Sequence, residues 1–161
     1  MNLPKSKKLK ILVTTGSVLE FDLLSKTIDK LNSNSIYCII IQIGKGKYIP
    51  KNCKYFKFDD SLDKYYKWAD LVITHTGAGT LFELLNQNKK IISVANPKAV
   101  LNHGLPIKLD KENYLKYISY NYINVDYFKK YISKILNNKI KFKKYKKEKQ
   151  TIGKTILNYI G

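Results

Sequence analysis

Residues 36–43, Ile-Tyr-Cys-Ile-Ile-Ile-Gln-Ile, limit the folds open to this chain more than any other stretch. A strand with one face in water alternates apolar and polar side chains, and this stretch does not alternate. We therefore expect it to be a central strand of a parallel sheet, with both of its faces covered.

Apolar runs of strand length alternate with segments of helical periodicity along the rest of the chain. We expect further strands at residues 9–14, 55–58, 71–74 and 90–95, and helices within residues 21–31, 65–68, 81–85 and 127–135. A loop over residues 98–104 should follow the last of these strands. The alternation predicts an α/β fold with a doubly wound parallel sheet, and ligands at the carboxyl ends of its strands.

The chain has 161 residues, which is the size of one domain. We expect a folded domain over residues 1–138 and a lysine-rich C-terminal tail with a helix over residues 139–161. No apolar run approaches the roughly 20 residues that span a bilayer, and the N-terminus lacks the apolar segment of a signal peptide. These features predict a cytoplasmic protein. Its cysteines, Cys38 and Cys53, should be reduced core residues.

The cations of this chain are all lysines: there are 30 of them, no arginine, and a formal net charge of +18. An AT-rich genome would produce part of this excess by composition alone. Residues 127–161 are more informative, because they contain eleven lysines and one acid, Glu148. Such a segment would seek nucleic acid or the anionic cytoplasmic leaflet. Base-specific readout depends on arginine, so we favour a membrane surface and no nucleic acid.

The stretch 73–83, Ile-Thr-His-Thr-Gly-Ala-Gly-Thr-Leu-Phe-Glu, has the pattern of a strand, a glycine turn and a helix. We expect Glu83 to lie in the first turn of that helix. The free backbone N–H groups and the positive end of the helix dipole would then point at one place. That arrangement suits a diphosphate.

Glycine turns follow three of the expected strands, at Gly16, at Gly44 with Gly46, and at Gly77 with Gly79. A single glycine pair after a strand is more often a tight connection than a ligand cradle. Together with residues 102–104, Asn-His-Gly, after a fourth strand, the three turns should meet at the carboxyl edge of the sheet. This convergence favours a nucleotide site.

Two side chains near the glycine turn have both a structural and a functional interpretation. His75 would donate a hydrogen bond to a phosphate oxygen, or would be a hydrogen-bonded histidine at the sheet edge. Glu83 would accept hydrogen bonds from both hydroxyls of a ribose. Alternatively, Thr80 and Glu83 match a capping box, in which they satisfy helix N-terminal amides. Spacing does not decide between the two roles of Glu83.

Four segments resemble, in the same order, the nucleotide-binding half of family 28 glycosyltransferases: residues 13–16, 42–46, 69–80 and 102–103. The resemblance extends over residues 9–120. It is strongest to half-length members, namely the cytosolic subunits of two-part UDP-GlcNAc transferases and bacterial capsule or exopolysaccharide galactosyltransferase subunits. Residues 48–53 look like the bacterial branch.

The resemblance implies a Rossmann-like domain that is one half of a GT-B glycosyltransferase, with a UDP-sugar as donor. It assigns the diphosphate to His75, Gly77, Ala78, Gly79 and Thr80, the ribose to Glu83, and the donor sugar or the opposite wall to Gly16, Gly44, Asn102 and His103. This chain departs from the family's Asn-His-Gln segment, because the third position is Gly104 instead of glutamine. That change removes a hydrogen-bonding group from the sugar pocket.

By the same resemblance, the chain is the donor-binding catalytic subunit of a two-subunit inverting hexosyltransferase. It would transfer galactose or N-acetylglucosamine to a lipid-linked saccharide in capsule or exopolysaccharide synthesis. The general base would come from a membrane-associated, acceptor-binding partner subunit, which recruits the chain to the cytoplasmic face of the membrane. No cofactor and no metal are expected, since the chain has no Asp-x-Asp motif.

Three alternatives remain open at this point. In the first, the chain is a non-catalytic nucleotide-sugar-binding scaffold subunit, and Gly104 accompanies the loss of catalytic turnover. It would belong instead to the dolichol-pathway UDP-GlcNAc transferases. The apolar residues of the tail would dock the partner or would pack on the domain's own sheet; they are Ile152, Ile156, Leu157 and Ile160.

Overall fold

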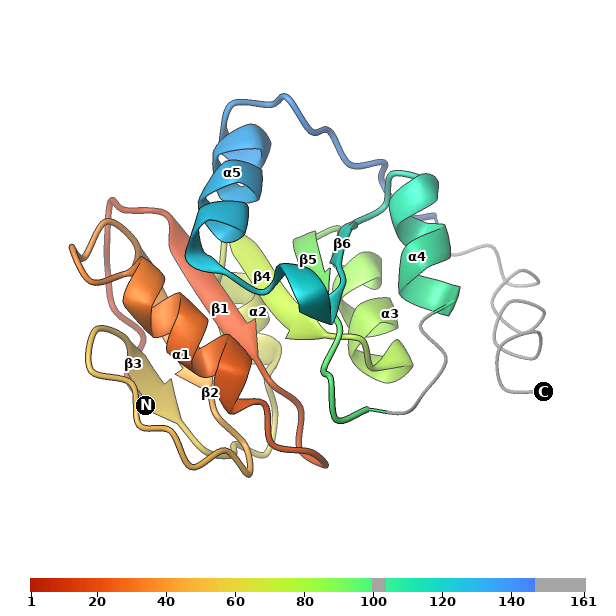
Figure 1. Ribbon diagram of the computed structural model, residues 1–161. Helices are drawn as coiled ribbons and strands as arrows, with labels where there is room; N and C mark the ends of the chain where they lie inside the picture. The colour runs from red at the N-terminus through yellow and green to blue at the C-terminus, as the bar shows by residue number, and fades with distance from the viewer. Residues whose placement is uncertain (100–103, 147–161) are drawn as a thin grey trace.

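A computed structural model describes residues 1–99 and 104–146, and a six-stranded sheet runs through its centre (Figure 1). The strands lie in the order β3-β2-β1-β4-β5-β6, and every neighbouring pair is parallel. Their bounds are β1 Lys10–Thr14, β2 Cys38–Gln42, β3 Lys54–Phe56, β4 Leu71–His75, β5 Lys90–Val94 and β6 Lys116–Ile118. The predicted doubly wound parallel sheet is confirmed.

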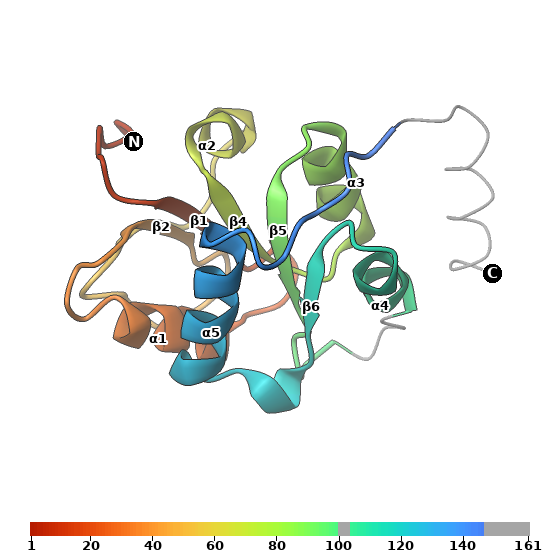
Figure 2. The same cartoon turned by 90° about the horizontal axis from the view of Figure 1, so that it is seen from above.

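Helices cover both faces of the sheet (Figure 2). Helices α1, Asp22–Leu31, and α5, Val125–Leu136, lie together on one face. Helices α2, Asp63–Trp68, α3, Ala78–Asn86, and α4, Gly104–Lys111, contribute to the core on the other. A short 3-10 turn, Tyr120–Tyr122, connects β6 to α5.

The alternation of side chains along β1 explains why three successive residues at its centre, Ile11 to Val13, are apolar. Ile11 and Val13 belong to the core under α1 and α5, and Leu12 belongs to the core under the other three helices. In β2, Ile39 and Ile41 lie on the first side and Ile40 on the second. Because successive side chains point to opposite faces, a strand covered on both sides has apolar residues at successive positions and not at every second one.

Two elements were not foreseen. Helix α4 begins at Gly104, where a loop was expected to end, and β6 follows it with the mixed sequence Lys-Tyr-Ile. Pro106 lies in the first turn of α4, where a helix tolerates proline because no intrahelical N–H bond is lost. The apolar content of both segments is too low to give a clear period.

The chain continues past α5 as an extended segment that crosses to α3 and α4 (Figure 1). The amide of Lys143 donates to the carbonyl of Asn113 at 2.8 Å, and the amide of Tyr145 donates to Oδ1 of Asn88 at 2.9 Å. The ring of Tyr145 packs edge-on against Tyr114. The helix expected near the C-terminus lies outside the described residues, and the division of the chain at residue 138 stays a prediction.

Among the helices that the structure describes, none has the length and apolar character needed to cross a membrane.

Candidate functional site

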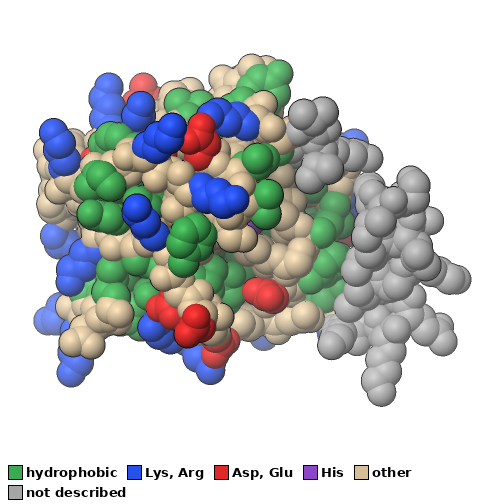
Figure 3. Space-filling model, turned by 90° about the horizontal axis from the view of Figure 1, so that it is seen from below, with side chains coloured by type: hydrophobic (Ala, Val, Ile, Leu, Met, Phe, Trp, Pro, Cys, Tyr) green, Lys and Arg blue, Asp and Glu red, His purple; other side chains and the backbone are tan. Residues whose placement is uncertain are grey.

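A cavity of about 670 Å³ opens at the carboxyl edge of the sheet. Figure 3 shows the molecule from this side. The ends of β1 and β4 form its floor, at the point where the strand order turns in opposite directions from the centre of the sheet. Ligands of open α/β sheets bind at such a switch point. Its lining residues include Thr14, Gly16, Leu19, His75, Gly77, Ala78, Thr80, Asn96 and Leu105.

The imidazole of His75 lies between the glycine turns that follow β1 and β4. A Cβ atom at Gly77 would lie 2.4 Å from Nε2 of His75, and one at Gly16 would lie 3.0 Å from the same atom. Gly16 also has a φ of +84°, which disfavours a side chain there. Both glycines are therefore required for the ring to occupy this place.

His75 is half-buried at the end of β4. Burial lowers its pKa, although a hydrogen bond to the backbone of Thr14 opposes the shift. The imidazole is therefore neutral near pH 7 and carries one N–H group. That N–H can donate either to the backbone of Thr14 or to a phosphate oxygen, and the neutral ring adds no positive charge to the site.

The turns after β1 and β2 support each other. A Cβ at Gly44, whose φ is +54°, would lie 2.3 Å from the carbonyl oxygen of Gly16. The hydroxyl of Thr15 donates to the carbonyl of Gln42 at 2.9 Å. Gly44 thus lies behind the wall formed by Gly16 and is not among the cavity-lining residues.

Helix α3 begins at the cavity. Gly77 is its N-cap, with extended backbone and no side chain to accept from the first amides. The first amides of an α-helix have no partner within the helix, and the helix dipole places partial positive charge beside them. Ala78 and Thr80 line the cavity, whereas a Cβ at Gly79 would meet nothing within 4 Å. The helix end therefore suits an anion such as a diphosphate.

The expected position of Glu83 in the first turn of this helix is wrong. The helix begins at Ala78, its first turn holds no acid, and Glu83 lies in the second turn. Thr80 is a helical residue and not the N-cap, so the capping box is excluded as well. The cause is that Gly77, which can adopt the cap conformation, precedes the position that the pattern indicated.

Glu83 interacts with a tyrosine of the neighbouring helix. Burial and a hydrogen bond to Glu83 together raise the pKa of Tyr66, which comes from α2. Glu83 is exposed and is not among the cavity-lining residues. Its assignment to a ribose stays a prediction, as do the other assigned roles.

The loops after β1 and β5 are fastened together at the rim. The buried side chain of Asn96 donates to the carbonyl of Glu20 at 3.0 Å and accepts from the amide of Lys98 at 3.0 Å. Lys98 also forms an ion pair with Glu20 and lowers its pKa. Asn96 was missed in the sequence, where it stood only as a break after a strand. The other assigned sugar-pocket residues, Asn102 and His103, lie outside the described part of the chain.

Across residues 1–99 and 104–146, no group of three or more His, Cys, Asp or Glu side chains could hold a metal ion. The metal-independent site stays a prediction.

Relatives with similar sequences include UDP-N-acetylglucosamine transferase subunit ALG13 of Homo sapiens, which is 32% identical over 121 residues, 66% of this chain and 11% of the human protein. The UDP-N-acetylglucosamine--N-acetylmuramyl-(pentapeptide) pyrophosphoryl-undecaprenol N-acetylglucosamine transferase of Pseudoalteromonas translucida is 33% identical over 114 residues, 61% of this chain and 32% of that protein. The matched part is thus about a tenth to a third of the length of these relatives.

Solved structures share the fold at lower identity. MurG of Acinetobacter baumannii gives a TM-score of 0.68 at 20% identity, over 85% of this chain and 46% of MurG. The solution structure of ALG13 gives 0.59 at 18% identity, over 83% of this chain and 88% of that one. The calicheamicin glycosyltransferase CalG4 gives a TM-score of 0.67 at 12% identity, over 83% of this chain and 36% of CalG4. The fold is one Rossmann-like half of a GT-B glycosyltransferase.

The sequence model of the glycosyltransferase family 28 C-terminal domain matches residues 10–158. This match contains all six strands and the cavity that lies at their ends. It confirms the resemblance carried by the four motifs, and the chain belongs to the glycosyltransferase family 28 C-terminal domain family.

Proposed function

We propose that this chain is the donor-binding subunit of a two-subunit UDP-sugar transferase, which transfers a hexose with inversion to a lipid-linked saccharide. The observation that carries the proposal is the cavity at the switch point, where His75 and the N-terminus of α3 face one space. Membership of family 28 supports it.

N-acetylglucosamine is the hexose that the relatives favour. The human and the Pseudoalteromonas relatives are both described as N-acetylglucosamine transferases. Residues 48–53 favour a bacterial capsule or exopolysaccharide enzyme, for which galactose is the competing donor sugar. Our proposal therefore takes UDP-N-acetylglucosamine as the first donor to test and UDP-galactose as the second.

In the proposed reaction, the chain stabilises the departing UDP. Negative charge grows on the diphosphate as the bond to the sugar breaks, and the first amides of α3 would hold that charge together with the N–H of His75. Glu83 would accept hydrogen bonds from the ribose, and Tyr66 would orient its carboxylate. No metal takes part in this proposal.

The acceptor would be activated by a partner. Among the cavity-lining residues within the described ranges 1–99 and 104–146, His75 is the one titratable side chain, and no carboxylate is among them. Since His75 is assigned to the leaving group, the general base and the acceptor site are proposed to come from a membrane-associated subunit. That subunit would recruit the chain to the cytoplasmic face of the membrane, and the lysine-rich segment 139–161 would help to dock it.

A non-catalytic scaffold is the second candidate, and Gly104 favours it. This glycine is the first residue of α4, and it stands where the family carries a glutamine that contacts the sugar. A scaffold of this kind would bind UDP and would transfer no hexose.

The test has two arms that separate these readings. Calorimetry of the full chain with UDP measures binding, and Glu83→Gln should weaken it by roughly tenfold, because hydrogen bonds to a charged group contribute about 1.5–3 kcal/mol. The same variant should change affinity for 2′-deoxy-UDP less. Membranes of the source organism with radiolabelled UDP-sugars then measure transfer. Binding without transfer from any donor would support the scaffold, and absence of UDP binding would contradict both candidates.

A further inference from the structure

Within the described residues, three of the four lysines on α2 and α4 form ion pairs with acids, whereas the lysines of α1 and α5 form none. On the α2, α3 and α4 side, Nζ of Lys64 lies 2.7 Å from Asp59 and Nζ of Lys67 lies 2.7 Å from Asp63. A weaker pair, Lys108 with Glu112 at 3.9 Å, lies on α4. The charges of these side chains are largely balanced locally.

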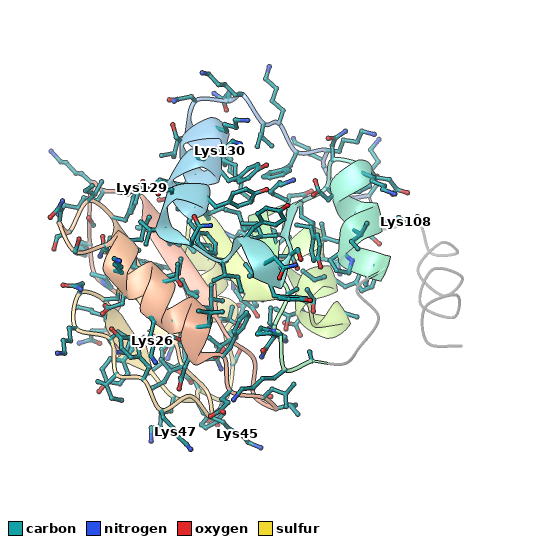
Figure 4. All side chains as sticks on the ribbon, in the orientation of Figure 1. Lys26, Lys45, Lys47, Lys108, Lys129 and Lys130 are labelled. Atoms are coloured by element: carbon teal, nitrogen blue, oxygen red, sulfur yellow. The ribbon has the colours of Figure 1, made fainter. Side chains whose placement is uncertain are left out.

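The face formed by α1 and α5 differs. It carries five lysines, and within the described residues none of them forms an ion pair: Lys26, Lys30, Lys129, Lys130 and Lys134. Four of them are exposed and Lys134 is half-buried. Figure 4 labels Lys26 on α1, and Lys129 and Lys130 on α5. We call this surface the α1/α5 face.

The acids of α1 do not neutralise these lysines, because they are committed to a loop. The carboxylate of Asp22 accepts hydrogen bonds from the amides of Lys47 and Tyr48, at 2.9 and 3.1 Å. Asp29 is buried and accepts from the amide of Asn52 at 2.7 Å and from the hydroxyl of Tyr48 at 2.7 Å. Asp126, at the start of α5, is the one acid of the two helices that is exposed.

Leucines project from the same surface as the lysines. Leu23 is 45% exposed and stands three residues before Lys26, so the two share one side of α1. Leu136 is 42% exposed and stands seven residues after Lys129, on one side of α5. Exposed leucines beside cations are the composition of surfaces that lie in a lipid headgroup region.

We propose that the α1/α5 face binds directly to an anionic lipid bilayer. The lysines would attract the charged headgroups, and Leu23 and Leu136 would enter the boundary of the acyl chains. Nucleic acid is disfavoured as the occupant, because it offers no apolar phase to the leucines and because the chain has no arginine. The inference goes beyond the proposed function, since it needs neither a donor nor a partner subunit.

Both helices begin at the edge of the sheet where the cavity opens, because each follows the carboxyl end of a parallel strand. A bilayer on the α1/α5 face would therefore lie next to the cavity and would not cover it.

The test uses the full chain and sedimentation with vesicles of phosphatidylcholine, alone or mixed with phosphatidylserine. The variant Lys26→Gln, Lys129→Gln, Lys130→Gln removes three charges from the face. The control Lys54→Gln, Lys57→Gln, Lys90→Gln removes three exposed, unpaired charges outside the two helices. Each lysine near a membrane is worth about fivefold in partitioning, so the face variant should bind roughly a hundredfold more weakly. The control should retain most of the binding.

Equal loss in the two variants would overturn the proposal, because net charge alone would then explain binding. Binding to phosphatidylcholine vesicles that equals binding to the mixed vesicles would also overturn it. A second variant, Leu23→Ser with Leu136→Ser, keeps every charge and should weaken binding several-fold. Competition by an RNA homopolymer that displaces the chain from vesicles through the same three lysines, with no effect of the leucine variant, would identify nucleic acid as the occupant instead.

Discussion

The imidazole of His75 occupies the space that a side chain at position 77 would need, since a Cβ there would lie 2.4 Å from Nε2. Gly79, two residues on, has open space where its Cβ would stand. The two glycines of this turn therefore differ: an alanine methyl group at position 77 would collide with His75, whereas one at position 79 would meet no neighbouring atom. This difference provides a matched test of the site.

Gly77→Ala should displace the imidazole and weaken UDP binding at least tenfold. Gly79→Ala should leave UDP affinity nearly unchanged and should raise the free energy of unfolding by about 0.5–1 kcal/mol, because alanine favours the interior of a helix. Titration calorimetry and urea unfolding of both variants measure these effects. Equal affinity for UDP in the two variants would contradict the assigned role of the turn.

Asp29 holds the loop after β2 against α1, and its removal should destabilise the fold. The carboxylate is buried and accepts from the amides of Lys51 and Asn52 and from the hydroxyl of Tyr48. Asp29→Ala leaves these donors without their partner, which should cost about 1–3 kcal/mol. Urea unfolding measures the change. Asp60→Ala, at an exposed position, should stay within about 0.5 kcal/mol of the unmodified chain.

Tyr48 should give the protein a specific sensitivity to alkaline pH. The hydrogen bond to Asp29 raises the pKa of Tyr48 to about 12, above the ordinary value of 10.0. A raised pKa means that the folded state favours the protonated phenol. The stabilisation is therefore complete below pH 10 and is lost as the pH rises from 10 to about 12. Tyr48→Phe should unfold with a weaker pH dependence over this interval, as measured by thermal melts.

Asp59 should show the opposite behaviour in acid. Hydrogen bonds from Lys64 and Tyr65 lower its pKa from 3.8 to about 2. The folded state thus favours the carboxylate, and its contribution is present above pH 3.8 and is lost as the pH falls towards 2. Asp59→Asn should remove this part of the acid sensitivity. Thermal melts at intervals between pH 2 and 5 would reveal it, and parallel curves for both proteins would contradict it.

Asn96 should matter more to the cavity than the ion pair beside it. Asn96→Ala removes two hydrogen bonds of a buried side chain, and should cost about 1–3 kcal/mol and weaken UDP binding by loosening the rim. Lys98→Met removes only the solvent-screened pair with Glu20, and such surface ion pairs contribute little to stability. A larger loss of affinity in Lys98→Met would contradict this ranking.

The sheet was predictable from the sequence because its central strands contain uninterrupted apolar runs. Residues 36–43 and 71–74 have no polar face, and that pattern has few interpretations other than a doubly covered parallel strand. Helix α4 and β6 were not predictable, since Gly104 and Pro106 resemble a loop and Lys116–Ile118 has only three residues. Their places depend on tertiary packing of Leu105, Leu109 and Leu115.

The candidate site was predictable where backbone geometry decides it. Gly16, His75 and Gly77 come together because parallel strands end at one edge, and the sequence shows where each strand ends. Glu83 was misplaced because a capping motif and a glycine cap compete within four residues. The fastening of Asn96 to the backbone of Glu20 joins positions 76 residues apart, and no local pattern indicates such a contact.

The strand order also has a consequence for synthesis on the ribosome. As the chain emerges, β2 pairs with β1, β3 with β2, β4 with β1, β5 with β4 and β6 with β5. Every strand therefore finds its neighbour already made, which suits folding from the N-terminus during translation. The other edge of β1 stays unpaired until β4 has been synthesised. A nascent chain that stalls before Leu71 would expose this apolar edge, and the fragment would be prone to aggregate.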